Sequence, residues 1–255
     1  MSPKVSIITV VFNSVKQIED TIKSVLEQSY PNLEYIIIDG GSTDGTKAII
    51  EKYKANLAHY VSERDGGIYE AMNKGMQLAS GEWVNFMNSG DTFYSAKTIE
   101  EVFEKAKLSF DIIYGDYIAN YDRKGQRLIK AALPQPPHQM VLSHQSVFAR
   151  STALKLFPFD TQLRISADLK FYEQCWHHGL KFHYFPHVIS IRSHAGLSEL
   201  HRPLAFKETE EVLNAFYDKE LVTRLMKRIK LMYLIKKGAK KIMPSFLQRI
   251  YRRNA

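Results

Sequence analysis

The chain has 255 residues, of which 45% are hydrophobic and 24% charged, a composition that supports a folded core and excludes a disordered, collagen-like or coiled-coil protein. The single cysteine, Cys175, excludes a disulfide framework and a cysteine-based zinc site. The apolar runs near the N-terminus are far shorter than the roughly 18 residues that span a bilayer, and no signal peptide is predicted.

The net charge of +8 is concentrated near the C-terminus. From Arg224 to Ala255 there are eleven basic residues and no acidic one, which leaves 24 basic and 27 acidic residues before them. Apolar residues at helical spacing alternate with the basic ones, as in an interfacial amphipathic helix. We therefore predict a domain of residues 1–220 and a basic helical tail of residues 221–255, divided into two helices at Gly238 and Pro244. The pattern favours an anionic membrane surface over nucleic acid as its partner, and packing against the rest of the chain is the alternative.

Strands and helices alternate in the first part of the chain. Val5–Phe12 is a continuous apolar run, typical of a strand buried on both faces, and Asn13 or Ser14 is placed to cap the next helix. The following predicted elements are strands at Tyr35–Asp39, Leu57–Ser62 and Glu82–Met87 and helices at Lys47–Tyr53 and Ile68–Ala79. This order predicts an α/β fold with a Rossmann-like, open, mostly parallel sheet.

The pattern changes after Asp111. Asp111–Asn120 and Arg127–Ala132 flank a turn and predict a hairpin, followed by a strand at Gln145–Ala149. A helix at Ala167–His178 and a strand at Phe182–Ile191 complete the domain. An antiparallel region is therefore appended to the parallel sheet.

Polar residues follow each of the first four predicted strands. They are Asn13, Asp39, the pair Arg64–Asp65 and the segment Asn88–Asp91. Ligands of open α/β sheets bind at these carboxyl ends. The sequence lacks the glycine fingerprint of dinucleotide-binding folds, the P-loop and the G-x-S-x-G motif of hydrolases, so those three classes are excluded.

Four segments resemble inverting family 2 glycosyltransferases with a GT-A fold. The segments are Val5–Asn13, Ile38–Gly45, Glu63–Gly75 and Ala79–Glu82, with Asn88–Asp91 where these enzymes carry their Asp-x-Asp motif. The resemblance covers roughly residues 4–200. It implies a hexosyltransferase that moves a sugar from a nucleotide sugar, usually a UDP-sugar, to a hydroxyl of a glycan or lipid-linked glycan. Family habit suggests surface polysaccharide synthesis, such as lipopolysaccharide O-antigen or capsule.

The resemblance also implies a set of donor contacts. They are Thr9, Val11, Asn13, Asp39, Arg64, Asp65, Gly67, Asn73, Lys74, Asn88 and Ser89. Asp39 is expected to accept a hydrogen bond from N3–H of uracil, because a carboxylate only accepts. A turn-forming Asp39, an ordinary turn at Gly66–Gly67 and a solvated Lys74 are the alternatives. Ser42 and Asp44 are expected to cap the next helix rather than to touch the ligand.

The metal motif departs from the family pattern, because this chain has Asn88-Ser89-Gly90 and then Asp91. A hard cation on oxygen ligands stabilises a departing diphosphate, so we expect Mn²⁺ or Mg²⁺ on Asp91, with Asn88 as a further oxygen ligand or a ribose contact. His194 lies where some relatives place a late metal or phosphate ligand, and an ordinary loop histidine is the alternative. Gly90 leaves open a non-catalytic paralogue that only binds nucleotide sugars. A nucleotidyltransferase is a weaker alternative, because the basic, glycine-rich loop it needs is absent.

The resemblance makes Asp168 the expected catalytic base, at the start of a helix beneath the acceptor. Its alternative role is a carboxylate that only stabilises the helix N-terminus. His144 and Gln145 resemble the stretch that borders the acceptor pocket. We expect a cytoplasmic enzyme held peripherally at the inner membrane by its basic tail; the donor sugar, the acceptor and the oligomeric state stay open.

Overall fold

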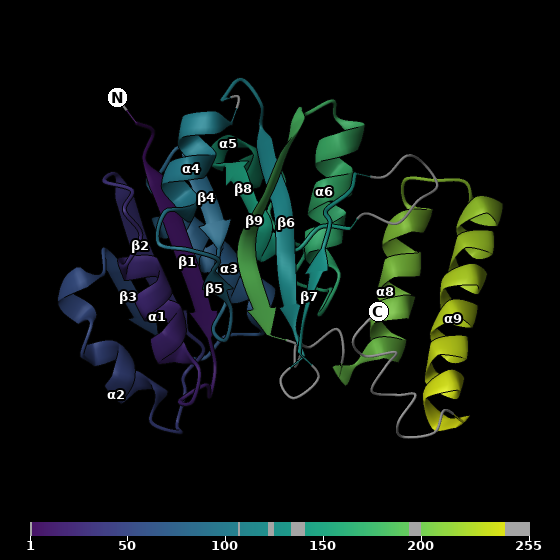
Figure 1. Cartoon of the computed structure of the whole chain (residues 1–255), viewed down its shortest axis with the longest axis horizontal. Helices are drawn as coiled ribbons and strands as arrows, with labels where there is room; N and C mark the ends of the chain where they lie inside the picture. The colour runs from purple at the N-terminus through teal and green to yellow at the C-terminus, as the bar shows by residue number, and fades with distance from the viewer. Residues whose placement is uncertain (1, 107, 122–124, 134–140, 194–199, 243–255) are drawn as a thin grey trace.

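The computed structural model describes residues 2–106, 108–121, 125–133, 141–193 and 200–242 (Figure 1). The strands within these ranges are β1 (Val5–Val11), β2 (Leu33–Asp39), β3 (His59–Ser62), β4 (Trp83–Phe86), β5 (Thr92–Phe93), β6 (Ile112–Asn120), β7 (Gln126–Ile129), β8 (Val147–Arg150) and β9 (Phe182–Ser193). The helices are α1 (Ile18–Leu26), α2 (Thr46–Glu51), α3 (Ile68–Leu78), α4 (Thr98–Lys105), α5 (Ser151–Leu156), α6 (Ala167–His177), α8 (Arg202–Asn214) and α9 (Lys219–Ile242), with short 3₁₀ turns at Lys54–Asn56 and His144–Ser146.

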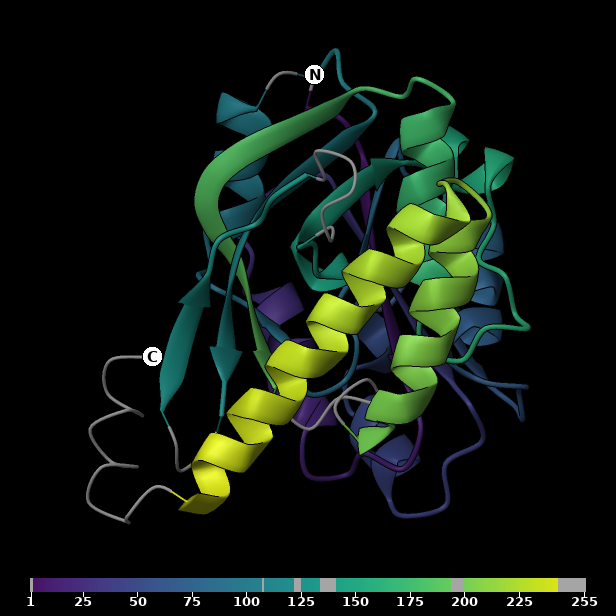
Figure 2. The ribbon, with the colours of Figure 1, turned by 90° about the vertical axis from the view of Figure 1, so that its right-hand side faces the viewer.

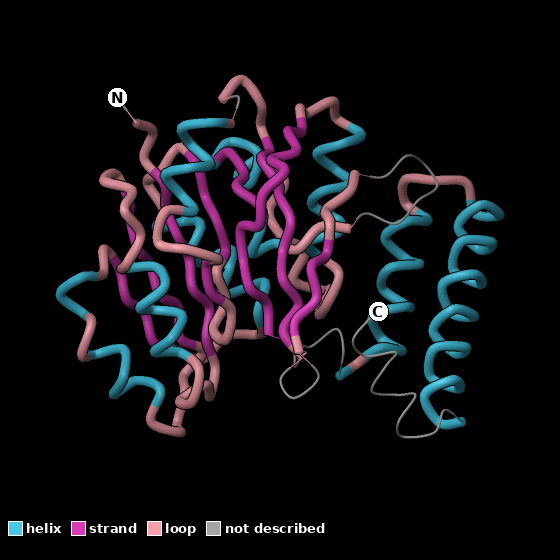
Figure 3. Tube along the Cα trace, viewed as in Figure 1, coloured by secondary structure: helices cyan, strands magenta, loops and turns pink. Residues whose placement is uncertain are grey.

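A single sheet forms the centre of the described structure (Figure 3). Its strand order is β3-β2-β1-β4-β8-β6-β9-β5, with β7 paired to β6. The first four strands in this order are parallel to one another, whereas β8 is antiparallel to both of its neighbours. The predicted α/β sheet with an appended antiparallel region is therefore confirmed, including the β6–β7 hairpin.

The sheet is covered on both faces, because its central strands are apolar on both sides. In β1, the side chain of Ile8 packs in the cluster that contains Met72 of α3. The side chain of Ile7 packs in the opposite cluster, with Ile22 of α1. This alternation follows from the two-residue period of a strand. The rigid sheet fixes where its polar strand ends lie.

The predicted helix caps at Asn13, Ser14 and Ser42 are wrong. The N-cap of α1 is Gln17, and no side chain caps it. Asn13 instead adopts a left-handed backbone conformation with φ of 46°, which asparagine tolerates better than most residues. Its Oδ1 accepts a hydrogen bond from the backbone N–H of Thr43, and its own N–H donates to Oγ of Ser42. The loops after β1 and β2 are thus tied to each other, and Ser42 is not a helix cap.

Asp44 contacts the start of α2, although the N-cap residue is Gly45. Its Oδ1 accepts hydrogen bonds from the N–H and the hydroxyl of Thr46, the first residue of that helix. The expectation that Asp44 serves the helix end rather than a ligand agrees with these contacts.

The basic tail begins with one long helix. Helix α9 continues to Ile242 and is not divided at Gly238, where a break was predicted; Pro244 lies outside the described residues. Helices α8 and α9 lie side by side (Figure 2). Val222 and Met226 are buried in their contact, so the first part of α9 packs on the domain. No helix in the described ranges is long and apolar enough to cross a membrane.

A buried carboxylate lies near the amino end of β2, at the end of the strands opposite the predicted site. Glu34 accepts hydrogen bonds from Lys4 Nζ, Ser6 Oγ and the N–H and hydroxyl of Ser80. Burial alone raises the pKa of Glu34, but these donors outweigh it and lower its pKa from 4.5 to about 2. The ionised side chain therefore stabilises the folded chain.

We expect Glu34→Gln to lower the free energy of unfolding at pH 7 by about 1–3 kcal/mol. Because the folded pKa is depressed, this contribution is complete above pH 4.5 and is lost as the pH falls toward 2. Urea unfolding of both proteins between pH 7 and pH 2.5 measures it. The exposed Glu27→Gln is the control, and a stability gap that does not narrow on acidification contradicts the assignment.

Candidate active site

Three strand ends meet through hydrogen bonds at the carboxyl edge of β1, β2 and β3. The Asp39 side chain is fully buried there, and its carboxylate accepts hydrogen bonds from the Ser42 N–H and, at 2.6 Å, from the Ser62 hydroxyl. Ionised carboxylates have lone pairs beyond these two partners. The predicted role of Asp39 toward uracil stays a prediction.

The loop between β3 and α3 reaches the same edge. A Cβ added at Gly40 lies 2.9 Å from Oδ2 of Asp65, so the loops after β2 and β3 are in contact. Burial raises the pKa of Asp65, whose Oδ1 accepts the N–H of Gly67. Gly67 is the N-cap residue of α3 and has φ of +136°, a backbone conformation that residues other than glycine rarely adopt. The guanidinium of Arg64 is exposed and has no hydrogen-bonding partner among the described residues.

Three of the predicted donor contacts have partners within the protein. Thr9 is fully buried inside the sheet, and its hydroxyl donates to the Met87 carbonyl. The amide of Asn73 bonds both the N–H and the carbonyl of Phe159, which ties α3 to the loop before α6. The donor contacts of these two side chains stay predictions. Lys74 is paired with Glu63, and its side chain is partly exposed; its contact with the donor stays a prediction.

The two remaining predicted contacts from the early strands lie at the edge itself. Val11 is the last residue of β1, and its carbonyl accepts the N–H of Gly40. Ser89 follows β4 and donates its hydroxyl to Ser14 Oγ at 2.7 Å. The loops after β1 and β4 are joined by this bond.

A chain of hydrogen bonds connects the altered metal motif to the predicted base. Nδ2 of Asn88 lies 2.8 Å from Nε2 of His144, and Nδ1 of His144 lies 3.3 Å from Oδ2 of Asp168. Oδ1 of Asp168 accepts hydrogen bonds from the Tyr69 hydroxyl and the Leu169 N–H. The Asp168 carboxylate is 23% exposed, so both of its oxygens are oriented while the group stays accessible.

Asp91 is buried, and both of its carboxylate oxygens accept hydrogen bonds within the protein. It is 5% exposed, with Oδ1 accepting the Ser193 N–H and Oδ2 accepting Nε2 of Gln145 at 2.5 Å. Burial raises the pKa of Asp91, and these donors oppose that effect. Gln145 belongs to the 3₁₀ turn before β8, where the sequence predicted the start of a strand.

The described residues offer a partial fit to a divalent cation. Oδ1 of Asn88 is buried and accepts no hydrogen bond from any residue that the structure describes, and Asp91 lies three residues further on. Oxygen donors of this kind suit Mg²⁺ or Mn²⁺, which take their other ligands from water and substrate phosphates. Within the described ranges no three acidic, histidine or cysteine side chains gather into a complete metal cluster, and His194 lies outside those ranges.

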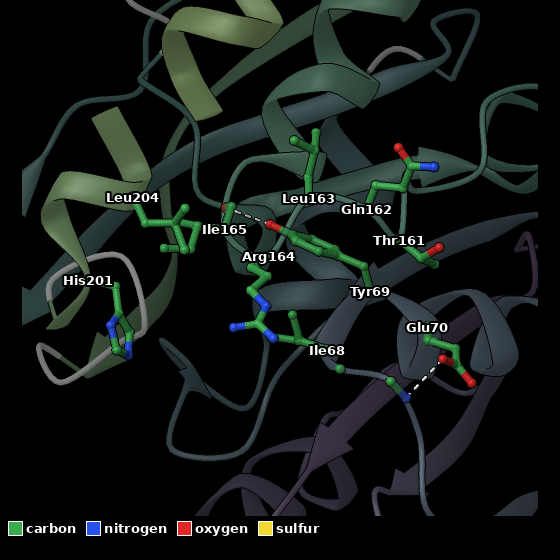
Figure 4. A pocket seen from close by; sticks show the side chains of 12 residues that line it. Ile68, Tyr69, Glu70, Thr161, Gln162, Leu163, Arg164, Ile165, His201 and Leu204 are labelled. Atoms are coloured by element: carbon green, nitrogen blue, oxygen red, sulfur yellow. Dashed lines mark hydrogen bonds between the residues drawn. The ribbon is translucent and has the colours of Figure 1, made fainter. Parts of the chain in front are cut away.

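A cavity of about 440 Å³ lies between the start of α3, the loop before α6 and the start of α8 (Figure 4). Tyr69 lines it, and the single proton of its hydroxyl is shared between the Ile165 carbonyl at 2.6 Å and Oδ1 of Asp168 at 3.2 Å. Burial, and then the negative charge of Asp168, raise the pKa of Tyr69 well above its usual value, so its hydroxyl remains a donor at neutral pH. Arg164 and His201 supply polar groups on the side of the cavity near α8. Tyr69 thus connects the cavity, which it lines, to the Asp168 carboxylate, to which it is hydrogen-bonded.

Sequence reasoning did not find the groups that hold this base in place. Glu208 of α8 is buried and accepts the backbone N–H groups of Arg164, Ile165 and Ser166, directly before α6. Its partners lie more than forty residues away in sequence, so no local pattern marks it. The sequence analysis identified the neighbouring polar residues His144 and Gln145, but it did not predict their hydrogen bonds to Asp168 and Asp91.

Comparison with known proteins decides the family. Residues 6–161 match the profile described as Glycosyl transferase family 2. The chain belongs to this family.

Two curated relatives of this glycosyltransferase extend the match. An uncharacterised glycosyltransferase of Mycobacterium tuberculosis is 34% identical over 177 residues, which cover 67% of this chain and 68% of that protein. A PGL/p-HBAD biosynthesis glycosyltransferase of Mycobacterium bovis is 28% identical over 235 residues, covering 88% and 84%.

Solved structures confirm the GT-A fold of this glycosyltransferase. S. aureus TarS 1–349 in complex with UDP-GlcNAc has a TM-score of 0.64 and 17% identity, covering 96% of this chain and 77% of that one. The mannosyltransferase PcManGT from Pyrobaculum calidifontis, in complex with GDP-Man and Mn²⁺, has a TM-score of 0.66 and 15% identity, covering 100% and 80%. The chain matches only 41% of the longer TarS chain.

Proposed function

We propose that this family 2 enzyme is an inverting hexosyltransferase that moves a sugar from a UDP-sugar to a hydroxyl of a glycan or lipid-linked glycan. The observation that carries the proposal is the Asp168 carboxylate, which is oriented at both oxygens and is hydrogen-bonded to Tyr69, a residue that lines a cavity. Inversion needs one carboxylate to take the acceptor's proton as its oxygen attacks the anomeric carbon. A carboxylate can take this proton on either of its oxygens and suits this role.

The donor is assigned to the edge formed by the ends of β1, β2 and β3. Asp39 is proposed to accept N3–H of uracil, while Asn13, Arg64 and Asp65 surround the nucleotide. A UDP-sugar is favoured because TarS, which shares the fold, is named in complex with UDP-GlcNAc. The PcManGT structure is a complex with GDP-Man, so the identity of the nucleobase, uracil or guanine, is the first point to test.

The acceptor is assigned to the cavity beside Tyr69. From there the acceptor's hydroxyl would reach Asp168, on the side of the sugar opposite the departing diphosphate. The names of the relatives favour a cell-surface glycan as the product, since one acts in PGL/p-HBAD biosynthesis and another, TuaG of Bacillus subtilis, is a putative teichuronic acid enzyme. O-antigen and capsule are the proposed product classes.

The proposed function is tested with a panel of nucleotide sugars. Each sugar nucleotide is added with Mn²⁺, and the melting temperature is measured, because a ligand stabilises the state that binds it. We expect UDP and one UDP-sugar to raise the melting temperature more than GDP-, CDP- or ADP-sugars do. Stabilisation by none of them contradicts a nucleotide-sugar site, whereas binding without any transfer or hydrolysis favours the non-catalytic alternative.

Mn²⁺ or Mg²⁺ is the proposed cofactor, held by Asp91, the Asn88 carbonyl oxygen and His194 together with the substrate. When bound, such a cation stabilises the negative charge of a departing diphosphate. We expect EDTA to abolish turnover of the wild type and added Mn²⁺ to restore it, whereas Asp91→Asn should lose most of this response. Unchanged turnover in EDTA contradicts the assignment. Since Asp91 also holds Gln145 and Ser193, the melting temperature of the variant is measured as a control.

The exposed part of α9 is proposed to hold the enzyme on the cytoplasmic face of the inner membrane. Leu231, Leu234 and Ile235 are each about 60% exposed, next to the exposed Lys227 and Arg228. Apolar side chains insert at the headgroup boundary, and each basic residue near an anionic leaflet contributes about 1 kcal/mol.

We expect the triple substitution of Leu231, Leu234 and Ile235 by glutamine to abolish flotation with anionic vesicles. The melting temperature should stay close to that of the wild type, because these side chains are exposed. Flotation of the wild type should weaken in high salt. The matched control is Leu156→Gln, which changes an equally exposed leucine on α5. Equal flotation of the triple variant and the wild type contradicts the role of α9.

A further inference from the structure

His144 lies between the two halves of the proposed site. It begins the 3₁₀ turn before β8, and its side chain is only 17% exposed. One ring nitrogen faces Asn88 and the other faces Asp168, at 2.8 and 3.3 Å. The next residue, Gln145, binds Asp91 and so fixes the turn from its other side.

The direction of these hydrogen bonds defines the state of the ring. The amide nitrogen of Asn88 can only donate, so Nε2 of His144 accepts. The proton of the neutral ring is therefore on Nδ1, where it donates to Oδ2 of Asp168. Asn88 thus selects the tautomer that His144 needs in order to hold the carboxylate.

The two oxygens of Asp168 are held independently. Oδ1 has two donors, the Tyr69 hydroxyl and the Leu169 N–H. For Oδ2, His144 is the one donor among the described residues. Without it, the carboxylate can rotate about its final bond, and the second oxygen loses its fixed direction.

We propose that His144 is a positioning residue for the base, a role that rests on the proposed function. It fixes Oδ2 of Asp168 so that a lone pair faces the acceptor hydroxyl. Through Asn88, it also links the orientation of the base to the motif on the donor side. Pre-organised orientation of this kind lowers the barrier without any contact between His144 and the substrate.

Two amide variants separate the functions of the two ring nitrogens. In His144→Asn, the side-chain nitrogen takes the place of Nδ1 and can still donate to Asp168. In His144→Gln, the longer amide reaches the place of Nε2 and meets Asn88 instead. Both variants remove the imidazole, so the pair controls for lost ring packing.

We expect His144→Gln to lower kcat for transfer about 10- to 100-fold, by analogy with the loss caused by substituting residues that orient metal ligands. The donor KM and the UDP affinity should each change less than about twofold. The melting temperature should change by no more than a few degrees. His144→Asn should recover most of kcat. In an Asp168→Asn background, His144→Gln should cause no further loss, because the two residues act as one unit.

Equal kcat values of the Asn and Gln variants, or additive losses in the double variant, overturn the proposal. A loss that follows the melting temperature assigns His144 to the scaffold and also overturns it. If wild-type protein turns over no nucleotide sugar, the proposed function itself fails, whereas an active wild type with fully active His144 variants rejects this inference alone.

Discussion

Asp168→Asn is expected to lower transfer about 10²- to 10⁴-fold while UDP affinity stays within a few-fold of the wild type. The amide cannot take the acceptor's proton, but it keeps the size of the carboxylate and leaves an oxygen for Tyr69 and Leu169. The fold should therefore survive. Calorimetry with UDP and single-turnover transfer assays separate binding from chemistry.

The control for this prediction is Asp160→Asn. Asp160 lies eight residues before Asp168 and pairs with Lys170, which is on α6 like Asp168. This variant therefore removes a neighbouring carboxylate that the mechanism does not use. It should retain most of the transfer activity. Full activity of Asp168→Asn contradicts its role as the base, and equal losses in both variants indicate a general effect of charge.

Asp39→Ala is expected to weaken UDP binding by about 1–3 kcal/mol, which is about 5- to 150-fold in Kd. The reason is that the uracil N3–H loses its charged acceptor in a buried position. Calorimetry measures the change directly. The same variant should show a smaller loss toward a nucleotide that is not bound through uracil.

Asp39 also has internal partners, so its substitution needs a matched control. Ser62→Ala removes the 2.6 Å hydrogen bond to Asp39 without removing the acceptor for uracil. Its UDP affinity should stay close to that of the wild type. If both variants weaken binding equally, Asp39 acts by holding the loops together. Unchanged affinity in Asp39→Ala rejects the uracil contact.

Much of the sheet could be predicted because its signals are local. The apolar run of β1 and the alternating strands and helices up to β4 depend only on neighbouring residues. Helix α8 was missed because it buries few apolar residues, and one of its buried side chains is Glu208. That carboxylate is stable only because three distant backbone N–H groups donate to it. The continuity of α9 through Gly238 shows that one glycine does not end a helix.

The candidate site was predicted less completely, since side-chain partners come from the fold. Asn73 lies in a segment that resembles donor-binding motifs, yet its amide donates one hydrogen bond to the backbone of Phe159 and accepts another from it. Lys74 is neutralised by Glu63 from the preceding loop. His144 and Asp168 are separated by 24 residues, and only the arrangement of the turn before β8 against α6 brings them together. Spacing in the sequence carries no information on that approach.

The most direct test of the proposed mechanism is the anomeric configuration of the first product. The UDP-sugar that stabilises the protein most is incubated with enzyme and acceptor, or with water as the acceptor, and the anomeric proton is followed by NMR. A single base at Asp168 and direct displacement predict that an α-linked donor first gives a β-linked product. A product that first appears with the α configuration contradicts the mechanism.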